Sequence, residues 1–416
     1  MRLFRANEHQ ITMRNSRKKI AFIVEPHFMV HHVGVRNYIF SLYSLLSKNH
    51  DVDFVSSYPS AIGRTHWYRA IPKDPAEILR NEKSEDGVLQ GTPKSIGRRI
   101  AFHDFHAKQI TPDDFHHSHI GSDLSVEDYD IGIVTNPWLV HFEGRLPCQR
   151  LVGMVYDTVP NEYVFTRSDK PYSFASLHQR GFSYYRQHCD AVVAISEKAA
   201  RDFSSLVKVD SERVRWLPPV LPPAYEDVPT ASNSREGCVV LASPFDKRKG
   251  LAVMPNILNT AKDKIQKLFI YGGIRCSRGE LKQFFQDLKV DNVEWYPNAT
   301  AKKVKDLFSQ SKVLLFPSFD EGLGLPILEA QFCGCRAMVR DKQPMNQLIG
   351  MGSRFVTGQD TEDGKTLESM LRESFDHQAL QEWALEEFCS RHVERVLEEV
   401  LAIEQTHVSP REWHVA

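Results

Sequence analysis

The sequence contains no long hydrophobic run. No apolar stretch approaches the roughly 18 to 20 residues that a helix needs to cross a bilayer, because charged residues interrupt the longest candidates. The first 20 residues include several basic side chains, but no continuous apolar stretch follows them, so they do not read as a secretory signal. We therefore expect a cytoplasmic protein without a membrane span, in which residues 1–17 form a flexible lead-in.

The chain also lacks an excess of charge of either sign. It has 52 Lys and Arg against 53 Asp and Glu, so nothing at the level of the whole molecule favours binding to a nucleic acid. The content of 42% hydrophobic and 25% charged residues is typical of a globular protein, and 416 residues exceed what one hydrophobic core usually serves. We expect two domains of ordinary size.

A disulfide framework and a metal site are both missing from the pattern. The seven cysteines are odd in number and scattered, which favours a reducing compartment. Cys333 and Cys335 are separated by one residue, which fits neither the zinc nor the redox CxxC spacing, and we interpret them as buried thiols. The His-rich segment 102–119 fits no closed tetrahedral zinc pattern. We expect no metal and no cofactor, and interpret this segment as a polar loop or as a contact for an acceptor or a membrane surface.

Short β-branched runs alternate with helical patterns, which predicts parallel strands linked by helices. In the first half, strands are predicted at 19–25, 52–56, 131–135, 151–156 and 191–195, and residues 58–125 form an excursion from this sheet. In the second half, strands are predicted at 238–242, 267–271, 292–295 and 312–316. The fold class is therefore α/β, with two successive sheets that bind ligands beyond the carboxyl ends of their strands.

The same pattern divides the chain. Proline and small polar residues at 218–236 continue neither period, so this stretch is predicted to be the linker between a domain at 18–217 and a domain at 237–365. A helical pattern at 366–416 outlasts the second sheet.

The most informative segment is LFPSFDEGLGLPILEAQFCG, residues 315–334. A buried strand leads into a glycine loop, and Pro326 suits the first turn of the following helix because its φ is fixed, while Gly334 suits the C-terminal cap. The backbone N–H groups of residues 322–324 and the positive end of the helix can face a diphosphate. The loop residues Gly322, Leu323, Gly324 and Leu325 are therefore candidates for donor binding.

Glu321 and Glu329 flank this loop. A carboxylate beside a phosphate site repels the phosphate, so both side chains are better explained as acceptors for neutral hydroxyls, as a sugar and a ribose provide. A sugar nucleotide offers that combination.

The spacing of Glu321 and Glu329 within FPSFDEGLGLPILEA resembles the signature of the family-four, retaining GT-B glycosyltransferases. The resemblance implies two Rossmann-like domains that face each other across a cleft, with the donor on the second domain and the acceptor on the first. It implies that Glu321 holds hydroxyls of the donor sugar and that Glu329 binds the ribose. It extends over about residues 19–350 and is specific mainly after Gly237.

Two further stretches of the second half match the family in the expected order. ASPFDKRKG, residues 242–250, resembles the loop that carries an Arg/Lys pair, which implies that Arg248 and Lys249 clamp the diphosphate; Ser243 stands where many relatives have another arginine. Two cations there would offset charge on the leaving group. Gly272 and Gly273 end a strand as the nucleotide-side loop of the family does, and Tyr296 falls where residues flanking the base are found. These matches imply donor contacts.

In the first half the matches are weaker. HHVGVRNY, residues 31–38, is similar to the GGxxRY loop of the family and makes Gly34 and Arg36 donor candidates and His32 an acceptor candidate. YDTVP, residues 156–160, resembles the HD element at the mouth of the cleft, with Tyr156 in the usual His position. Asp157 and Tyr156 are therefore acceptor candidates. Ser196, in a segment like the ISxxxxxD of the family, either only caps a helix or also faces the cleft.

The resemblance implies a hexosyltransferase that moves a sugar from a nucleoside diphosphate sugar to a saccharide hydroxyl with retention and without a metal. Arg248, Lys249 and Glu321 would act with Asp157 as the catalytic set. The preferred acceptor is a saccharide or lipid-linked saccharide of bacterial surface polysaccharide, with peripheral contact to the inner face of the membrane through basic residues near 14–19 and 98–99.

Two alternatives stay open. A non-catalytic sugar-nucleotide-binding or assembly protein of the same fold would keep the donor loop, and Tyr156 in place of the usual His favours this idea. A NAD-dependent oxidoreductase also suits two α/β domains but is disfavoured, because no GxGxxG follows the first strand.

Overall fold

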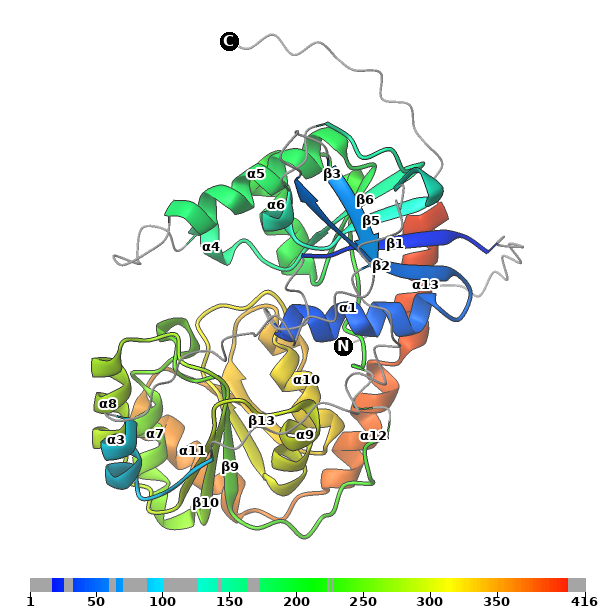
Figure 1. Cartoon of the computed structure of the whole chain (residues 1–416). Helices are drawn as coiled ribbons and strands as arrows, with labels where there is room; N and C mark the ends of the chain where they lie inside the picture. The colour runs from blue at the N-terminus through cyan, green and yellow to red at the C-terminus, as the bar shows by residue number, and fades with distance from the viewer. Residues whose placement is uncertain are drawn as a thin grey trace.

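Two seven-stranded sheets, each flanked by helices, form two domains that lie against one another (Figure 1). The computed structural model describes residues 17–25, 33–59, 65–69, 88–100, 126–140, 144–162, 172–222, 225 and 227–402. Within these ranges, every helix is too short or too polar to traverse a lipid bilayer.

The first sheet has the strand order β3-β2-β1-β5-β6-β7-β8. Its strands are β1 (Lys19–Ile23), β2 (Asp51–Pro59), β3 (Thr65–Arg69), β5 (Ile131–Val134), β6 (Arg150–Val155), β7 (Ala191–Ala194) and β8 (Val214–Trp216). All pairs are parallel except β2 with β3. Its helices are α1 (Val33–Leu46), α4 (Val159–Glu162), α5 (Tyr172–His188) and α6 (Glu197–Val207). The α/β prediction for this half is confirmed, although the edge strands β3 and β8 were not predicted.

The second sheet has the order β14-β13-β12-β9-β10-β11-β4. Its strands from the second half are β9 (Cys238–Ala242), β10 (Lys267–Tyr271), β11 (Val293–Tyr296), β12 (Val313–Phe316), β13 (Arg336–Arg340) and β14 (Arg354–Val356), all parallel. The helices α7 (Met254–Thr260), α8 (Arg278–Asp287) and α11 (Asp360–Arg372) cover one face, and α9 (Ala301–Gln310) and α10 (Leu325–Phe332) cover the other (Figure 1).

The central strands formed where they were predicted because both of their faces are buried. Every residue of β5, β6, β7, β9 and β12 is inaccessible to solvent or nearly so. A parallel strand covered on both faces reads as a continuous apolar run, and such a run is visible in the sequence alone. One hydrophobic cluster contains residues of both sheets, including Phe22, Val240 and Phe316, so apolar packing continues from one domain into the other.

A segment of the first half joins the second domain, which corrects the division of the chain at 218–236. Strand β4 (Leu89–Gly91) pairs antiparallel with β11 at the edge of the second sheet, and α3 (Pro93–Ile100) packs on α8 (Figure 1). Leu89 and Ile96 are buried in the second hydrophobic core. A three-residue strand of the sequence LQG has no alternating pattern of its own, so only its partner strand identifies it.

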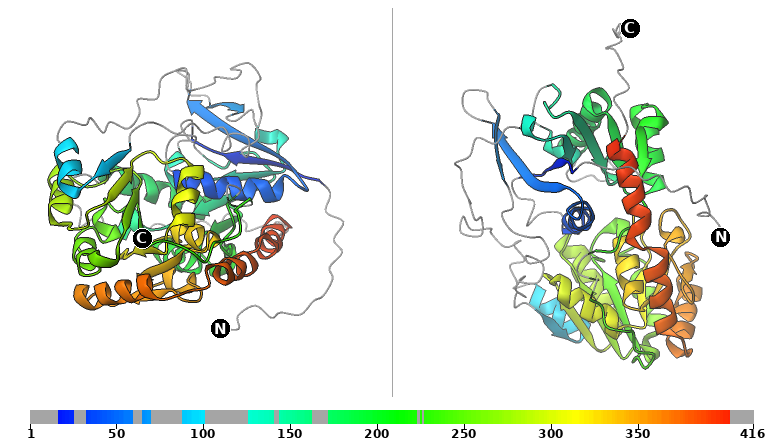
Figure 2. Two further views of the ribbon diagram at one scale, coloured as in Figure 1. Left: turned by 90° about the horizontal axis from the view of Figure 1, so that it is seen from below. Right: turned by 90° about the vertical axis from the view of Figure 1, so that its right-hand side faces the viewer.

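The C-terminal helical pattern is three helices rather than one segment. α11 begins at Asp360 and packs on α7 within the second domain, α12 (His377–Glu387) packs on α10, and α13 (Ser390–Ala402) packs on α1 of the first domain. Figure 2 shows α13 running alongside both domains. The break before α12 is explained by Asp376, whose side chain accepts a hydrogen bond of 3.0 Å from the N–H of Ala379 as an N-cap.

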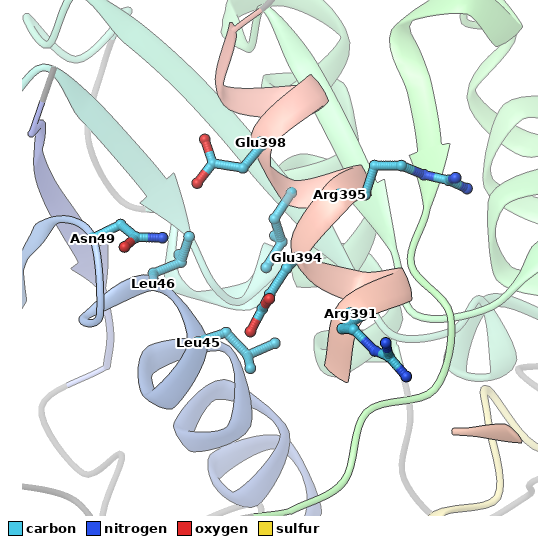
Figure 3. A pocket seen from close by; sticks show the side chains of 8 residues that line it. Leu45, Leu46, Asn49, Arg391, Glu394, Arg395 and Glu398 are labelled. Atoms are coloured by element: carbon cyan, nitrogen blue, oxygen red, sulfur yellow. The ribbon is translucent and has the colours of Figure 1, made fainter. Parts of the chain in front are cut away.

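Polar contacts fix α13 to the first domain. Lys48 Nζ lies 2.9 Å from Glu394, and Nε2 of the buried His50 lies 3.1 Å from Glu398. A cavity of about 300 Å³ lies between the end of α1 and α13. Figure 3 shows Glu394 and Glu398 on the side of α13 that faces α1. None of the predicted site residues lines this cavity.

Candidate active site

The strand order of the second sheet brings two predicted loops together. β9 is paired in parallel with β12, although β10 and β11 lie between them in the sequence. The loops 243–250 and 317–324 therefore leave the same edge of the sheet at neighbouring positions, at the point where the strand order reverses. Open α/β sheets bind their ligands at such a point.

Arg248, Lys249 and Glu321, three of the candidates from the sequence, converge at this edge. Glu321 Oε1 lies 2.9 Å from Arg248 Nη1 and 2.6 Å from Lys249 Nζ. The hydroxyl of Ser318 donates a further hydrogen bond of 2.6 Å to the same carboxylate oxygen. Arg248 also donates from its guanidinium to the carbonyl oxygen of Asp320, which links the two loops directly.

The environment keeps Glu321 ionised. Burial alone would raise the pKa of this carboxyl, but Lys249 and Arg248 outweigh it and lower the pKa to about 2. Each side chain of the cluster is at most 14% exposed, so water screens their interactions weakly. Glu321 is therefore a buried carboxylate paired with two cations.

The loop between Glu321 and α10 turns directly into the start of the helix. Gly324 has φ +100° and is the N-cap residue of α10, with Leu325 and Pro326 as the first helical residues. The helix ends in a left-handed Gly334 (φ +71°), whose N–H donates to the carbonyl of Gln331 at 2.8 Å. α10 thus begins after Gly324 and ends before Gly334, as the positions of these glycines in the sequence predict.

Glu329 lies on α10 and is 9% exposed. Burial raises the pKa of its carboxyl to about 7, and no cation shifts it in the opposite direction. It lies near Tyr225 and Tyr271, since it contributes to the rise in the pKa of both phenols after their own burial. Glu329 is thus a polar group in an apolar setting, where a neutral hydroxyl fits better than a phosphate.

Asp157 of the first domain faces this cluster. It follows β6, and its Oδ1 accepts a hydrogen bond of 3.1 Å from the N–H of Val159. Burial raises the pKa of Asp157 to about 6, with the Arg248 charge lowering it and the Glu321 charge raising it. The structure therefore brings together the catalytic set predicted from both halves of the sequence.

The other candidates of the first domain lie differently from the prediction. Tyr156 is buried in the core, with its hydroxyl 3.9 Å from Met154 Sδ and its ring edge-on to Tyr38, so its hydroxyl does not face the donor loop. Gly34 and Arg36 lie in the first turns of α1 rather than in a loop; Gly34 is exposed, and Arg36 is buried beside Asn37. His32 and the His-rich segment lie outside the described residues.

The remaining donor candidates cluster at the ends of β9, β10 and β11. A Cβ on Gly272 would lie 2.2 Å from Ser243 Oγ, so these two residues are in contact, and both have positive φ. Gly273 has open space around its Cα, which leaves its backbone accessible. The hydroxyl of Tyr296 donates to Glu294 at 2.5 Å, and the ammonium of Lys303 lies 4.3 Å from the centre of its ring.

Three residues of the site were missed from the sequence. Ser318 binds Glu321, the carbonyl of Asp320 binds Arg248, and Asp246 accepts a 2.9 Å hydrogen bond from the N–H of Arg248. Asp246 could have been found, because an Asp side chain commonly accepts a hydrogen bond from the backbone N–H two residues further along the chain. Among the described residues, no group of three or more His, Cys, Asp or Glu is arranged to hold a metal ion.

Comparison with solved structures identifies the fold of this chain. Solved structures match over nearly the whole chain: HepE of Anabaena in complex with UDP and glucose (TM-score 0.60, 11% identity, 92% of this chain and 99% of that chain) and a glycosyltransferase of Rickettsia africae (TM-score 0.55, 14% identity, 93% and 98%). WaaG, a glycosyltransferase involved in lipopolysaccharide biosynthesis, matches with a TM-score of 0.54 at 15% identity over 92% and 98%. The fold is that of the GT-B glycosyltransferases, as predicted.

Comparisons of the sequence match parts of the chain to known glycosyltransferases. Residues 227–379, which contain the loop 317–324 and both glutamates, match the family model described as glycosyl transferases group 1. The O-antigen chain mannosyltransferase RfbU of Salmonella typhimurium is 29% identical over 92 residues, which are 21% of this chain and 26% of that protein. The match thus spans about a quarter of the length of this relative.

Proposed function

We propose that the protein is a retaining glycosyltransferase that transfers a hexosyl group from a nucleoside diphosphate sugar to a hydroxyl of a saccharide. The observation that carries the proposal is the convergence of Arg248, Lys249 and Glu321 at the edge of the second sheet, opposite Asp157 of the first domain. UDP and UDP-sugars are the first donors to test, because HepE was solved with UDP and glucose.

In the proposed reaction the bond between the anomeric carbon and the diphosphate breaks first. Arg248, Lys249 and the N-terminus of α10 stabilise the charge that develops on the diphosphate, which removes the need for a metal ion. The acceptor hydroxyl attacks the same face of the sugar and passes its proton to the departing phosphate oxygen. A diphosphate seated on the two cations competes with Glu321 for their N–H groups, so the carboxylate becomes available to the sugar hydroxyls.

The test is a panel of sugar nucleotides assayed for release of free nucleoside diphosphate with saccharide acceptors, and proton NMR of the product to establish the anomeric configuration. We expect Glu321→Ala to lower turnover at least a hundredfold and to leave the Kd of the nucleoside diphosphate within about fivefold. Glu368→Ala, on an exposed ion pair of α11, serves as the control. A wild-type protein that binds the nucleotide but turns over no donor would instead support the non-catalytic alternative.

The acceptor is proposed from the relatives. WaaG is titled as acting in lipopolysaccharide biosynthesis and RfbU as an O-antigen chain mannosyltransferase, so we propose a saccharide of bacterial surface polysaccharide, reached by peripheral contact with the cytoplasmic face of the membrane. Such contact is electrostatic and should weaken with salt. Recovery of all the protein away from membranes at low salt contradicts this part of the proposal.

A further inference from the structure

Two side chains of the first domain hold the loop on either side of Glu321. Ser196 Oγ donates a hydrogen bond of 2.6 Å to the carbonyl oxygen of Gly322, the residue after Glu321. Lys198 Nζ lies 3.2 Å from Oδ1 of Asp320, the residue before it. Both donors lie at the start of α6, which follows β7 of the first sheet. The loop that carries Glu321 is therefore attached across the domain boundary at both of its neighbours.

The hydroxyl of Ser196 has its direction fixed by the helix. As the N-cap of α6 it accepts a hydrogen bond of 3.1 Å from the N–H of Ala199. Its single hydrogen is then directed to Gly322, and Ser196 is only 5% exposed. A buried carbonyl that loses its donor bears a desolvation cost, so this bond contributes more than a bond at the surface. Helix capping and contact between the domains are combined in one side chain.

The ion pair of Lys198 is buried as well. The side chains of Lys198 and Asp320 are 10% and 3% exposed, and Lys198 Nζ also lies 2.6 Å from Asp202 on the next turn of α6. Burial lowers the pKa of the ammonium, but Asp202 and Asp320 outweigh burial and keep it raised, so the amine stays charged. Removal of the ammonium would leave Lys342, an exposed side chain 3.4 Å away, to pair with the buried Asp320.

The close contact of the backbones makes this arrangement specific to one placement of the domains. A Cβ on Gly322 would lie 2.1 Å from the carbonyl oxygen of Tyr156 and 3.0 Å from Asp157 Cβ. The loop therefore touches the first domain at the residue beside the acceptor candidate Asp157. A small relative movement of the domains breaks both the Ser196 and the Lys198 contacts.

We propose that Ser196 and Lys198 are positioning residues, which orient Glu321 toward Asp157 when the two domains are apposed. The inference rests on the proposed function for the role of Glu321, but the contacts themselves can be tested without turnover. Arg248, Lys249 and Glu329 belong to the second domain alone, so binding of the nucleotide does not require the two contacts. Their loss should therefore lower kcat and leave nucleotide affinity almost unchanged.

The experiment compares Ser196→Ala and Lys198→Met with Ser196→Thr, which keeps the hydroxyl. Asp376→Ala, which removes the N-cap of α12, and Lys365→Met, which removes an exposed ion pair, are the matched controls. We expect faster amide hydrogen exchange across residues 319–325 in the first two variants only. In the transferase assay we expect their kcat to fall about tenfold, with the Kd of UDP within about twofold of wild type.

Amide exchange tests the positioning role of Ser196 and Lys198, and the transferase assay of the wild type tests the proposed function. The inference is overturned if amide exchange across residues 319–325 is unchanged in both Ser196→Ala and Lys198→Met. It is also overturned if the wild type is active and the kcat of these two variants equals that of the control variants. If the wild type transfers no sugar from any donor, the proposed function fails, and the exchange data alone then decide whether Ser196 and Lys198 hold the loop. Recovery of slow exchange by Ser196→Thr supports the hydroxyl as the group responsible.

Discussion

At the scale of single residues, the pKa values of Glu321 and Glu329 are shifted in opposite directions. Glu321 has two cations within 3 Å and a pKa of about 2, whereas burial without a compensating cation raises the pKa of Glu329 to about 7. The first is a fixed charge at any pH near neutrality. The second changes its protonation near neutral pH, and this difference leads to a measurable effect on stability.

We predict that Glu329→Gln stabilises the protein above pH 7 and has little effect at pH 5. A folded-state pKa above the unfolded value means that the folded chain holds the proton longer, so stability is lost as pH rises from about 4.5 to about 7. The loss is on the order of 3 kcal/mol once the carboxyl is fully ionised, and glutamine does not incur it.

Thermal unfolding at pH 5 and pH 8 measures this effect. The variant should melt roughly 5 °C above wild type at pH 8 and within about 1 °C of it at pH 5. A difference in Tm that is the same at both pH values would show that Glu329 is not the titrating group.

At the scale of elements, the loop 317–324 is shaped by two different uses of glycine. Gly324 has φ +100°, a backbone conformation that residues with a side chain adopt only with strain. Gly322 is required for a different reason, because its Cα faces the carbonyl of Tyr156 in the other domain and leaves no room for a Cβ. The first glycine shapes the turn into α10. The second sets how closely the domains approach.

We predict that Gly322→Ala lowers kcat/KM at least tenfold, because the added Cβ at 2.1 Å from a backbone oxygen forces the loop away from Asp157. Gly279→Ala is the matched control, since it lies within α8 and its Cβ would meet nothing closer than 3.9 Å. Steady-state kinetics of both variants check the prediction. Equal kinetic constants for Gly322→Ala and wild type would show that this contact between the domains does not affect the site.

At the scale of the whole molecule, α12 and α13 connect α10 to the first domain. α12 packs on α10 and α13 packs on α1, and Val393, Leu397, Val400 and Leu401 of α13 are buried in the cluster that contains residues of both sheets. The C-terminal helices thus stabilise the relative placement of the domains.

We predict that Leu397→Ala destabilises the protein by about 2 kcal/mol, the lower end of the usual range for a buried leucine, because the cavity beside it already reduces its packing. Leu385→Ala, at a position that is 39% exposed, should change stability by less than about 0.5 kcal/mol. Urea denaturation followed by circular dichroism measures both. A loss at Leu397 no larger than at Leu385 would mean that α13 does not contribute to the shared core.

The sequence by itself determined the buried strands and the glycine loop before α10. β9 and β12 are continuous apolar runs, the loop before α10 carries its glycines and proline at the required positions, and Arg248, Lys249 and Glu321 each follow a recognisable strand. These signals are local, because burial of both strand faces and the turn conformations restrict neighbouring residues. The resemblance to a family added roles to these residues.

Only the tertiary structure decided the rest, because the partners are far apart in the chain. β4 becomes a strand by pairing with β11, which follows it by about 200 residues, and the three-residue sequence LQG gives no sign of this. Ser196 and Gly322 are 126 residues apart, and nothing around Ser196 distinguishes a helix cap from a cap that also binds a second domain. A contact between distant segments leaves no periodic pattern in either of them, so the positioning of Glu321 against Asp157 appears only when both sheets are assembled.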